Sequence, residues 1–309
     1  MLDAKHKSSY HKDMNRLDTQ KRAQILGLLV EGMSMRAVTR ITGCSINTVT
    51  KLLIDAGKAC AEYQNTIIRN VKVKRVQCDE IWSFCHSKQK NVAPENEGAL
   101  GHGDVWTWVA LDADSKLAIN WLVGLRNAEY AEEFMTDLAE RLSDRIQLTT
   151  DGHGVYINAV EKAFGGAIDY AMLVKVYDGM SAVEQRRYSP SHFVTAKKRQ
   201  INGLTKSAEV STSHVERQNL TIRMQNRRFT RLTNAFSKKI ENLEHSVALH
   251  FMHYNFARIH KTLRVTPAME AGLTEHVWSI EEIAALIPDP KAKKRGTYKK
   301  RAQASENSN

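Results

Sequence analysis

Three strand-like segments follow one another in the middle of the chain, before any strand alternates with a helix. Residues 76–84, 105–111 and 117–123 are rich in β-branched and aromatic side chains, which is typical of β-strands. The polar turn Asp112-Ala113-Asp114-Ser115 joins the second segment to the third. Since consecutive strands joined by a short turn pair side by side, these segments predict an antiparallel sheet.

Helices and strands alternate after the third segment. Residues 127–144 and 156–164 carry apolar side chains at helical spacing, whereas residues 146–150 and 168–176 are strand-like. A polar stretch follows, and then a long helix from about Ser213. This order predicts an α+β/α/β protein with a mixed five-stranded sheet flanked by helices. It is the element order of the RNase H-like fold.

An all-α domain is expected ahead of the sheet, in residues 19–60. Ser34 and Ser45 can cap the second and third of three short helices, and Gly43 lies in the turn between those two. The apolar positions expected to be buried in the second and third helices are Ala37, Val38, Ile41, Ile46, Val49, Leu52 and Leu53. Three helices with a glycine turn before the last predict a helix-turn-helix; the alternative is an ordinary helical bundle. The outward residues expected to contact DNA are Asn47, Thr48, Thr50 and Lys51.

Positive charge is concentrated at the two ends of the chain. The net charge is +11. Residues 1–75 carry 14 Lys and Arg against 6 Asp and Glu, and residues 289–309 carry 7 against 2. Basic ends around a nearly neutral middle indicate a polyanionic partner; the alternative is a protein with solvated basic ends.

Several protein classes are not supported by the composition. The four cysteines are scattered and form no CxxC pair, so neither a zinc site nor a disulfide framework is predicted. No apolar run approaches the roughly 20 residues of a membrane span. A cytoplasmic, nucleoid-associated protein without a membrane partner is therefore expected.

Three acidic residues stand where the predicted fold can bring them together. Asp79 lies in the middle of the first strand, and Asp151 directly follows the fourth strand, ahead of Gly152. The first and fourth strands are expected to be neighbours, so these two carboxylates can meet. Glu216 begins the closing helix, which then continues with basic residues.

These residue types suit metal-dependent attack on a phosphodiester. Mg²⁺ or Mn²⁺ prefers carboxylate ligands, and a pair of ions needs one bridging carboxylate and one more on each side. Asp79 is the expected bridge, with Asp151 and Glu216 completing two metal sites. The other acids fit less well: Glu80 points to the opposite strand face from Asp79, and the remaining candidates lie in turns and loops, namely Asp112, Asp114 and Glu209.

The same motifs resemble those of a known enzyme family, the insertion-sequence-one group of bacterial DDE transposases. The resemblance covers about residues 76–260 and rests on Asp79-Glu80-Ile81-Trp82-Ser83-Phe84, Thr150-Asp151-Gly152 with Tyr156, and Val215-Glu216-Arg217-Gln218-Asn219-Leu220. It implies a transposase that binds the terminal inverted repeats of its element, cleaves DNA with metal ions and transfers the strand into target double-stranded DNA. It also implies at least a homodimer on DNA.

Further DNA contacts are expected in two regions. Residues 178–212 look like a basic insertion that contacts DNA, and the closing helix carries a stripe that follows Glu216. The residues concerned are Arg186, Arg187, Lys197, Lys198, Arg199, Arg217, Asn219, Arg223 and Arg227. Among these, Arg223 matches the basic residue that the family places seven positions after the glutamate.

The chain is accordingly expected to have a linear succession of domains. The predicted parts are a flexible N-terminus (1–18), the helix-turn-helix (19–60), a linker (61–74), the catalytic domain (75–260), a C-terminal helical segment (261–288) and a basic tail (289–309). Two alternatives stay open. One is a DNA-binding regulator with an inactive RNase H-like domain, and the other is a nuclease without strand transfer.

Overall fold

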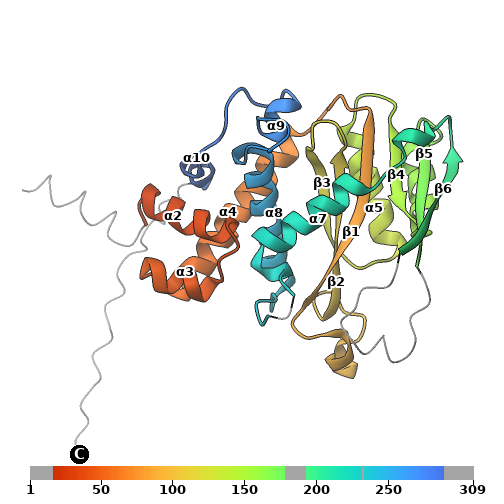
Figure 1. Cartoon of the computed structure of the whole chain (residues 1–309). Helices are drawn as coiled ribbons and strands as arrows, with labels where there is room; N and C mark the ends of the chain where they lie inside the picture. Colours follow the sequence, from red (N-terminus) through yellow and green to blue (C-terminus); the bar gives the residue numbers. More distant parts are fainter. Residues whose placement is uncertain (1–16, 178–192, 232, 289–309) are drawn as a thin grey trace, which may run out of the picture.

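A six-stranded sheet forms one side of the molecule, and a group of helices forms the other (Figure 1). The computed structural model describes residues 17–177, 193–231 and 233–288. The strands are β1 (Arg75–Cys85), β2 (Gly103–Asp112), β3 (Ala118–Gly124), β4 (Gln147–Asp151), β5 (Asp169–Tyr177) and β6 (Phe193–Asn202). Their order across the sheet is β3-β2-β1-β4-β5-β6.

The predicted neighbourhood of the first and fourth strands is confirmed. β1 pairs with β4 in parallel, with Cys78 opposite Thr150, and pairs with β2 in the antiparallel direction. β4 and β5 are also parallel, whereas β2 with β3 and β5 with β6 are antiparallel. This mixed sheet with flanking helices is consistent with an RNase H-like fold.

The prediction of five strands is wrong by one. β6 comes from residues 178–212, which the sequence predicted to be an inserted loop. It lies at the edge of the sheet, and its residues 194–200 are exposed. Charged side chains are common on edge strands because they discourage pairing with another chain. The basic run Lys197-Lys198-Arg199 therefore gave no strand signal. Arg186 and Arg187 lie outside the described residues.

Helices cover both faces of the sheet. α5 (Ala128–Arg141) and α6 (Val155–Phe164) pack on one face, where their buried side chains Phe134 and Tyr156 contact Trp108 of β2. α7 (Ser213–Gln225) and α8 (Ile240–Met252) contribute buried apolar side chains to a cluster on the other face, which includes Ile81 of β1.

The three N-terminal helices form with the predicted caps. They are α2 (Thr19–Val30), α3 (Met35–Thr42) and α4 (Ile46–Ile67). The Ser34 and Ser45 side chains accept hydrogen bonds from the backbone amides of Ala37 and Thr48, and Gly43 takes the left-handed conformation at the end of α3. α4 also runs through the first half of the predicted linker.

Two apolar residues were wrongly predicted to be buried. Ile41 and Ile46 flank the α3–α4 turn and are 52% and 42% exposed. The buried stripe of α4 begins one turn later, at Val49, and includes Leu52 and Leu53. The first turn of α4 therefore extends past the helices on which the rest of α4 packs, and it leaves Ile46 uncovered.

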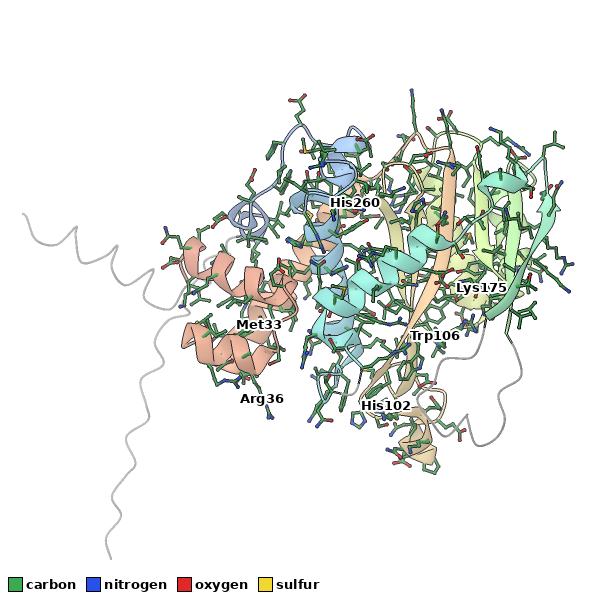
Figure 2. The ribbon with its side chains drawn as sticks, viewed as in Figure 1. Met33, Arg36, His102, Trp106, Lys175 and His260 are labelled. Carbon is green, nitrogen blue, oxygen red and sulfur yellow. The ribbon has the colours of Figure 1, made fainter. Side chains whose placement is uncertain are left out.

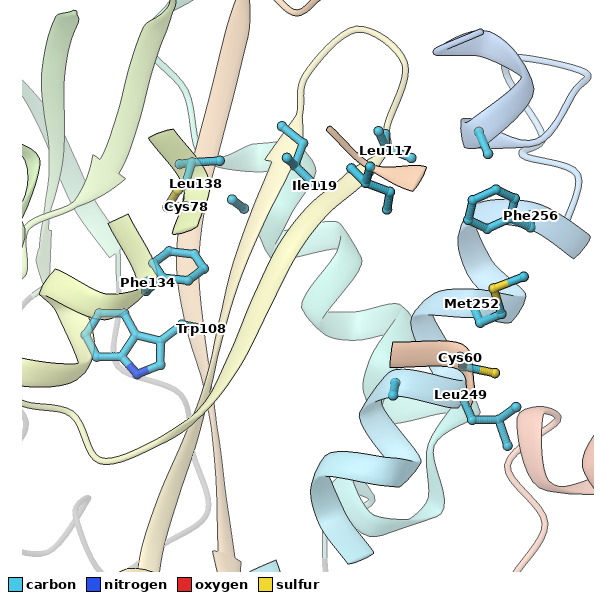
Figure 3. Close-up of a cluster of buried hydrophobic side chains, with 14 of the residues drawn as sticks. Cys60, Cys78, Trp108, Leu117, Ile119, Phe134, Leu138, Leu249, Met252 and Phe256 are labelled. Atoms are coloured by element: carbon cyan, nitrogen blue, oxygen red, sulfur yellow. The ribbon is translucent and has the colours of Figure 1, made fainter. Parts of the chain in front are cut away.

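One hydrophobic core joins these helices to the sheet. Figure 3 shows it passing from Trp108 and Phe134 on the sheet side to Cys60 of α4 and Leu249 of α8. Its C-terminal elements are α9 (Pro267–Glu270) and α10 (Ile280–Ala285), of which α10 lies beside α2 (Figure 1). No helix within the described ranges has the length and hydrophobicity needed to cross a membrane.

α4 and α8 lie in close backbone contact at Gly57. A Cβ atom placed on this residue would lie 2.6 Å from the Cα atom of His245 on α8. The Gln64 side chain, two turns further along α4, donates to the Ala248 carbonyl oxygen at 3.1 Å. Glycine at position 57 thus permits a backbone contact that a side chain would prevent.

We expect Gly57→Ala to destabilise the protein by about 1–3 kcal/mol, because the added methyl group forces α4 away from α8. Gly27→Ala is the matched control: Gly27 lies within α2, and a Cβ atom placed on it would have nothing within 4 Å. This control should stabilise the fold by about 0.5–1 kcal/mol, since alanine is the better helix former. Urea unfolding of both variants measures the difference, and equal stabilities would contradict the close α4–α8 contact.

Candidate active site

Three carboxylates meet at the end of β4. Oxygen atoms of Asp79, Glu80 and Asp151 all lie within 4.8 Å of one another. β4 stops at Asp151 while β1 continues to Cys85, so the sheet has an open edge beside Asp79. The group lies at a cleft of about 560 Å³, lined among others by Asp79, Asp151 and Glu216.

Glu216 reaches this cleft from α7. Val215 and Ile222 of α7 are buried against the sheet, which turns the side of the helix that carries Glu216 and Asn219 toward β1. The Asn219 amide donates a 2.8 Å hydrogen bond to Asp79 Oδ2. The Glu216 carboxylate accepts hydrogen bonds from the Lys175 ammonium and the Thr212 hydroxyl. Glu216 thus lines the same cleft as the other two predicted acids, but stands outside the compact group of three.

Glu80 is the acid that strand alternation had excluded from the predicted site. It lies on the other strand face from Asp79, as alternation requires, and its side chain is 1% exposed. Its Oε2 accepts hydrogen bonds from Arg126 at 3.2 and 3.3 Å. Even so, its carboxylate extends to the open edge beside Asp151. Side chains that alternate between the two faces of a strand can still meet at a point where the neighbouring strand ends.

The shared burial of these carboxylates makes their negative charge unfavourable. Burial raises the pKa of Asp79 to about 7, and the nearby Glu80 and Asp151 add to the shift. Burial, followed by the charge of Asp151, also raises the pKa of Glu80 to about 7, although Tyr156 and Arg126 oppose the shift. A bound cation would relieve this repulsion.

The available donors fit a hard divalent cation. They are carboxylate oxygens, which Mg²⁺ and Mn²⁺ prefer. Glu80 Oε1 is buried and has no hydrogen-bond partner among the residues that the structure describes. Asp151 Oδ1 is held by the backbone amide of His153 at 2.9 Å. Asp79 and Asp151 could therefore hold a metal ion at the open edge, with Glu80 and Glu216 beside it.

The basic stripe predicted on α7 is only partly present. Arg217 is exposed, and Arg223 is half-buried on the same helix. Arg227 does not continue the stripe, because α7 ends at Gln225 and Arg227 begins a separate turn, Arg227–Phe229. Asn219 is buried beside Asp79, a position that suits a residue which orients the carboxylate.

The remaining predicted DNA contacts do not line the cleft. Lys197, Lys198 and Arg199 are exposed on the edge strand β6. At the start of α4, Asn47 is exposed, and Lys51 is exposed and paired with Asp55. Thr48 and Thr50 are half-buried on the same turns.

Sequence reasoning also missed two basic residues of the cleft, Arg126 and Lys175. Arg126 lies between β3 and α5, and Lys175 belongs to β5 (labelled in Figure 2). Arg126 contacts Glu80 and Asp151, whereas Lys175 contacts Glu216. Since these partners come from distant segments, only the placement of the acids could have drawn attention to the two basic residues.

Comparison with known proteins gives weak similarities. No model of a protein family matches the chain, and no curated protein matches it. Among solved structures, the piggyBac transposase in its synaptic complex with hairpin DNA has 8% identity and a TM-score of 0.38, over 87% of this chain and 70% of that chain.

Mos1 transposase in its paired-end complex with the left transposon end has 12% identity and a TM-score of 0.22. The match covers 50% of this chain, which spans 59% of the length of the Mos1 chain. Mos1 transposase in the strand transfer complex has 13% identity and a TM-score of 0.22. These similarities are too low to support a function, which has to be inferred from the chain's own residues.

We expect Asp79→Asn to stabilise the metal-free protein at pH 8, because it removes an unfavourable buried charge. The folded-state pKa of Asp79 is about 7, above its ordinary value of 3.8, so this acid favours the fold at low pH and disfavours it as the pH rises through 7. The free energy of unfolding of Asp79→Asn should exceed that of the wild type by about 1–3 kcal/mol at pH 8 and by less at pH 5. Urea unfolding at the two pH values measures it.

Manganese provides the complementary measurement. Millimolar Mn²⁺ should raise the Tm of the wild-type protein, since a ligand that binds only the folded state stabilises it, and should leave Asp79→Asn unchanged. Glu95→Gln, in the exposed turn Pro94–Asn96, is the control and should respond to Mn²⁺ like the wild type. A metal response that survives in Asp79→Asn would exclude Asp79 as a ligand.

Proposed function

We propose that this protein is a DNA transposase that cleaves the ends of an insertion sequence and joins them to target DNA. The observation that carries the proposal is the cleft in which Asp79 and Asp151 meet while Glu216 faces them from α7. The three acids come from the two central strands and a helix packed on them, although 64 residues separate Asp151 from Glu216. The motifs around them resemble those of the insertion-sequence-one group.

The residues of the cleft would have different roles in the reaction. Asp79, oriented by Asn219, would hold Mg²⁺ or Mn²⁺ ions together with Asp151 and Glu216. When bound, these ions supply an activated oxygen nucleophile and stabilise the leaving oxygen. Lys175 pairs with Glu216 and offsets its negative charge.

Two transfers on phosphorus make up the proposed reaction. Water first attacks the phosphodiester at the element end, so that a P–O bond forms to water and the bond to the 3′-oxygen breaks. The freed 3′-hydroxyl then attacks a phosphodiester of the target, forming one P–O bond and releasing another 3′-hydroxyl. No covalent protein–DNA intermediate is required, because each nucleophile is an oxygen of water or DNA.

Recognition of the DNA would use surfaces outside the cleft. We propose that α3 and α4 form the helix-turn-helix, with the start of α4 in the major groove and Asn47 and Lys51 as contacts. β6 would contact phosphates through Lys197, Lys198 and Arg199. A homodimer or larger assembly would hold the two ends together.

The direct test uses the genomic DNA that flanks the coding sequence of this protein. With Mn²⁺ and a target plasmid, labelled flanking DNA should be cut at the ends of the element and joined to the plasmid. Cleavage without a joined product would identify a nuclease. Binding without cleavage would identify a DNA-binding regulator and overturn the proposal.

We expect Asp79→Asn to lower cleavage by roughly 10³-fold or more, since it removes a carboxylate that would hold the metal ions. Its affinity for the flanking DNA should stay within about twofold of the wild type, because the binding surfaces lie elsewhere. Gel-shift and cleavage assays on the same preparations check both values, with Glu95→Gln as the control for substitution of an acid. Loss of binding together with cleavage would assign Asp79 a structural role.

A further inference from the structure

Arg126 is held in place from two sides at the edge of the cleft. Its Nε and Nη2 atoms donate to Glu80 Oε2 at 3.3 and 3.2 Å. Its guanidinium also lies over the Trp106 ring, 4.8 Å from the ring centroid. Trp106 belongs to β2 and is labelled in Figure 2. Together, a buried carboxylate and an aromatic face fix the plane of the guanidinium.

The guanidinium also faces the proposed metal ligands. Nη2 lies 3.5 Å from Asp151 Oδ2, and Arg126 lines the cleft with Asp79 and Asp151. Its side chain is 32% exposed. Nη1 makes no hydrogen bond to any residue that the structure describes, so part of the donor fork remains available to a ligand.

Glu80 is better placed to anchor Arg126 than to bind a substrate. Its side chain is 1% exposed, and the Tyr156 hydroxyl lies beside it on the α6 side of the sheet. A paired cation stabilises a buried carboxylate, and Arg126 is the cation in contact with Glu80. This pairing accounts for an acid that the proposed catalytic set of Asp79, Asp151 and Glu216 does not use.

We propose that Arg126 is a substrate-binding residue whose guanidinium, positioned by Glu80 and Trp106, binds a non-bridging oxygen of the DNA phosphodiester at the metal site. The inference rests on the proposed function and extends it to a residue outside the three acids. Arginine suits this role because its planar donor fork matches two oxygens of a phosphate. Lys175 is less suited, since its ammonium is paired with Glu216.

Charge supports this assignment. Asp79, Asp151 and Glu216 line the cleft, with Glu80 buried beside them. Among the lysine and arginine residues that line it in the described structure, only Arg126 and Lys175 oppose this negative charge. A polyanionic substrate would be repelled from such a site. With Asp79 and Asp151 holding a cation, Arg126 would be available to the phosphate while Glu80 still holds it in position.

The test compares Arg126→Gln and Arg126→Lys with the wild type on flanking DNA. Arg126→Gln should lower kcat/KM for cleavage by about 10- to 100-fold, because a charge-assisted hydrogen bond to the phosphate is lost. DNA binding is measured separately with Ca²⁺ in place of the catalytic ion. When the logarithm of the DNA-binding constant is plotted against the logarithm of the salt concentration, the slope for Arg126→Gln should be smaller in magnitude by about 1. Arg126→Lys should recover the slope and only part of kcat/KM.

Arg145→Gln is the matched control. Arg145 also pairs with a carboxylate, that of Asp169 at 2.7 Å, but it does not line the cleft. It should leave kcat/KM and the salt slope unchanged. A wild-type protein that does not cut DNA would overturn the proposed function itself, whereas cutting by Arg126→Gln at the wild-type rate and salt slope would overturn only the role of Arg126.

Glu80→Gln tests the anchor. If Glu80 acts through Arg126, the double variant Glu80→Gln with Arg126→Gln should lose no more kcat/KM than Arg126→Gln alone. The Kd for Mn²⁺, measured by calorimetry without DNA, should stay within about threefold of the wild type in Glu80→Gln. A loss of Mn²⁺ affinity above about tenfold would instead make Glu80 a metal ligand and overturn its assignment as the anchor.

Discussion

The parallel pairing of β1 with β4 determines the geometry of the cleft. Cys78 stands opposite Thr150, so the next residues along the two strands, Asp79 and Asp151, are level with each other. β4 ends at this point and β1 continues, which leaves space beside the two carboxylates that no strand fills. A shift of one residue in this register would turn Asp79 to the other face of the sheet and separate it from α7.

The same geometry creates an electrostatic problem that the molecule solves with neighbouring cations. Three carboxylates within 4.8 Å of one another repel, and partial burial strengthens the repulsion by removing water. Arg126 reduces this repulsion through its contacts with Glu80 and Asp151, and Lys175 compensates the neighbouring Glu216. An acid cluster that remains poorly compensated at neutral pH is unfavourable for stability and favourable for binding a divalent cation, because the cation removes the repulsion.

The N-terminal helices are part of the same body as the sheet. α4 packs along α8, with Gly57 in close contact with His245, and α8 also contributes to the core on one face of the sheet. A rigid connection of this kind fixes the distance between the start of α4 and the cleft. If α4 binds DNA as proposed, the bound end would reach the acids at a defined position and would not depend on a loose linker.

The sequence by itself determined the order of the elements and the identity of the main acids. Strand alternation and capping residues such as Ser34 and Ser45 are local signals, and they correctly placed the first five strands and the helices between them. This order predicted that the first and fourth strands are neighbours in the sheet, which places Asp79 beside Asp151. Local rules were sufficient for the bounds of strands and helices, because alternation and capping depend only on a few adjacent residues.

Only the tertiary structure decided the features that depend on where a strand or helix ends in space. β6 was missed because an edge strand needs no apolar face, and Glu80 was set aside because alternation does not reveal that the next strand stops at Asp151. The contacts of Arg126 with Glu80, and of Lys175 with Glu216, join segments more than 40 residues apart. Burial and repulsion act between neighbours in space, so these partners become visible once the chain has folded.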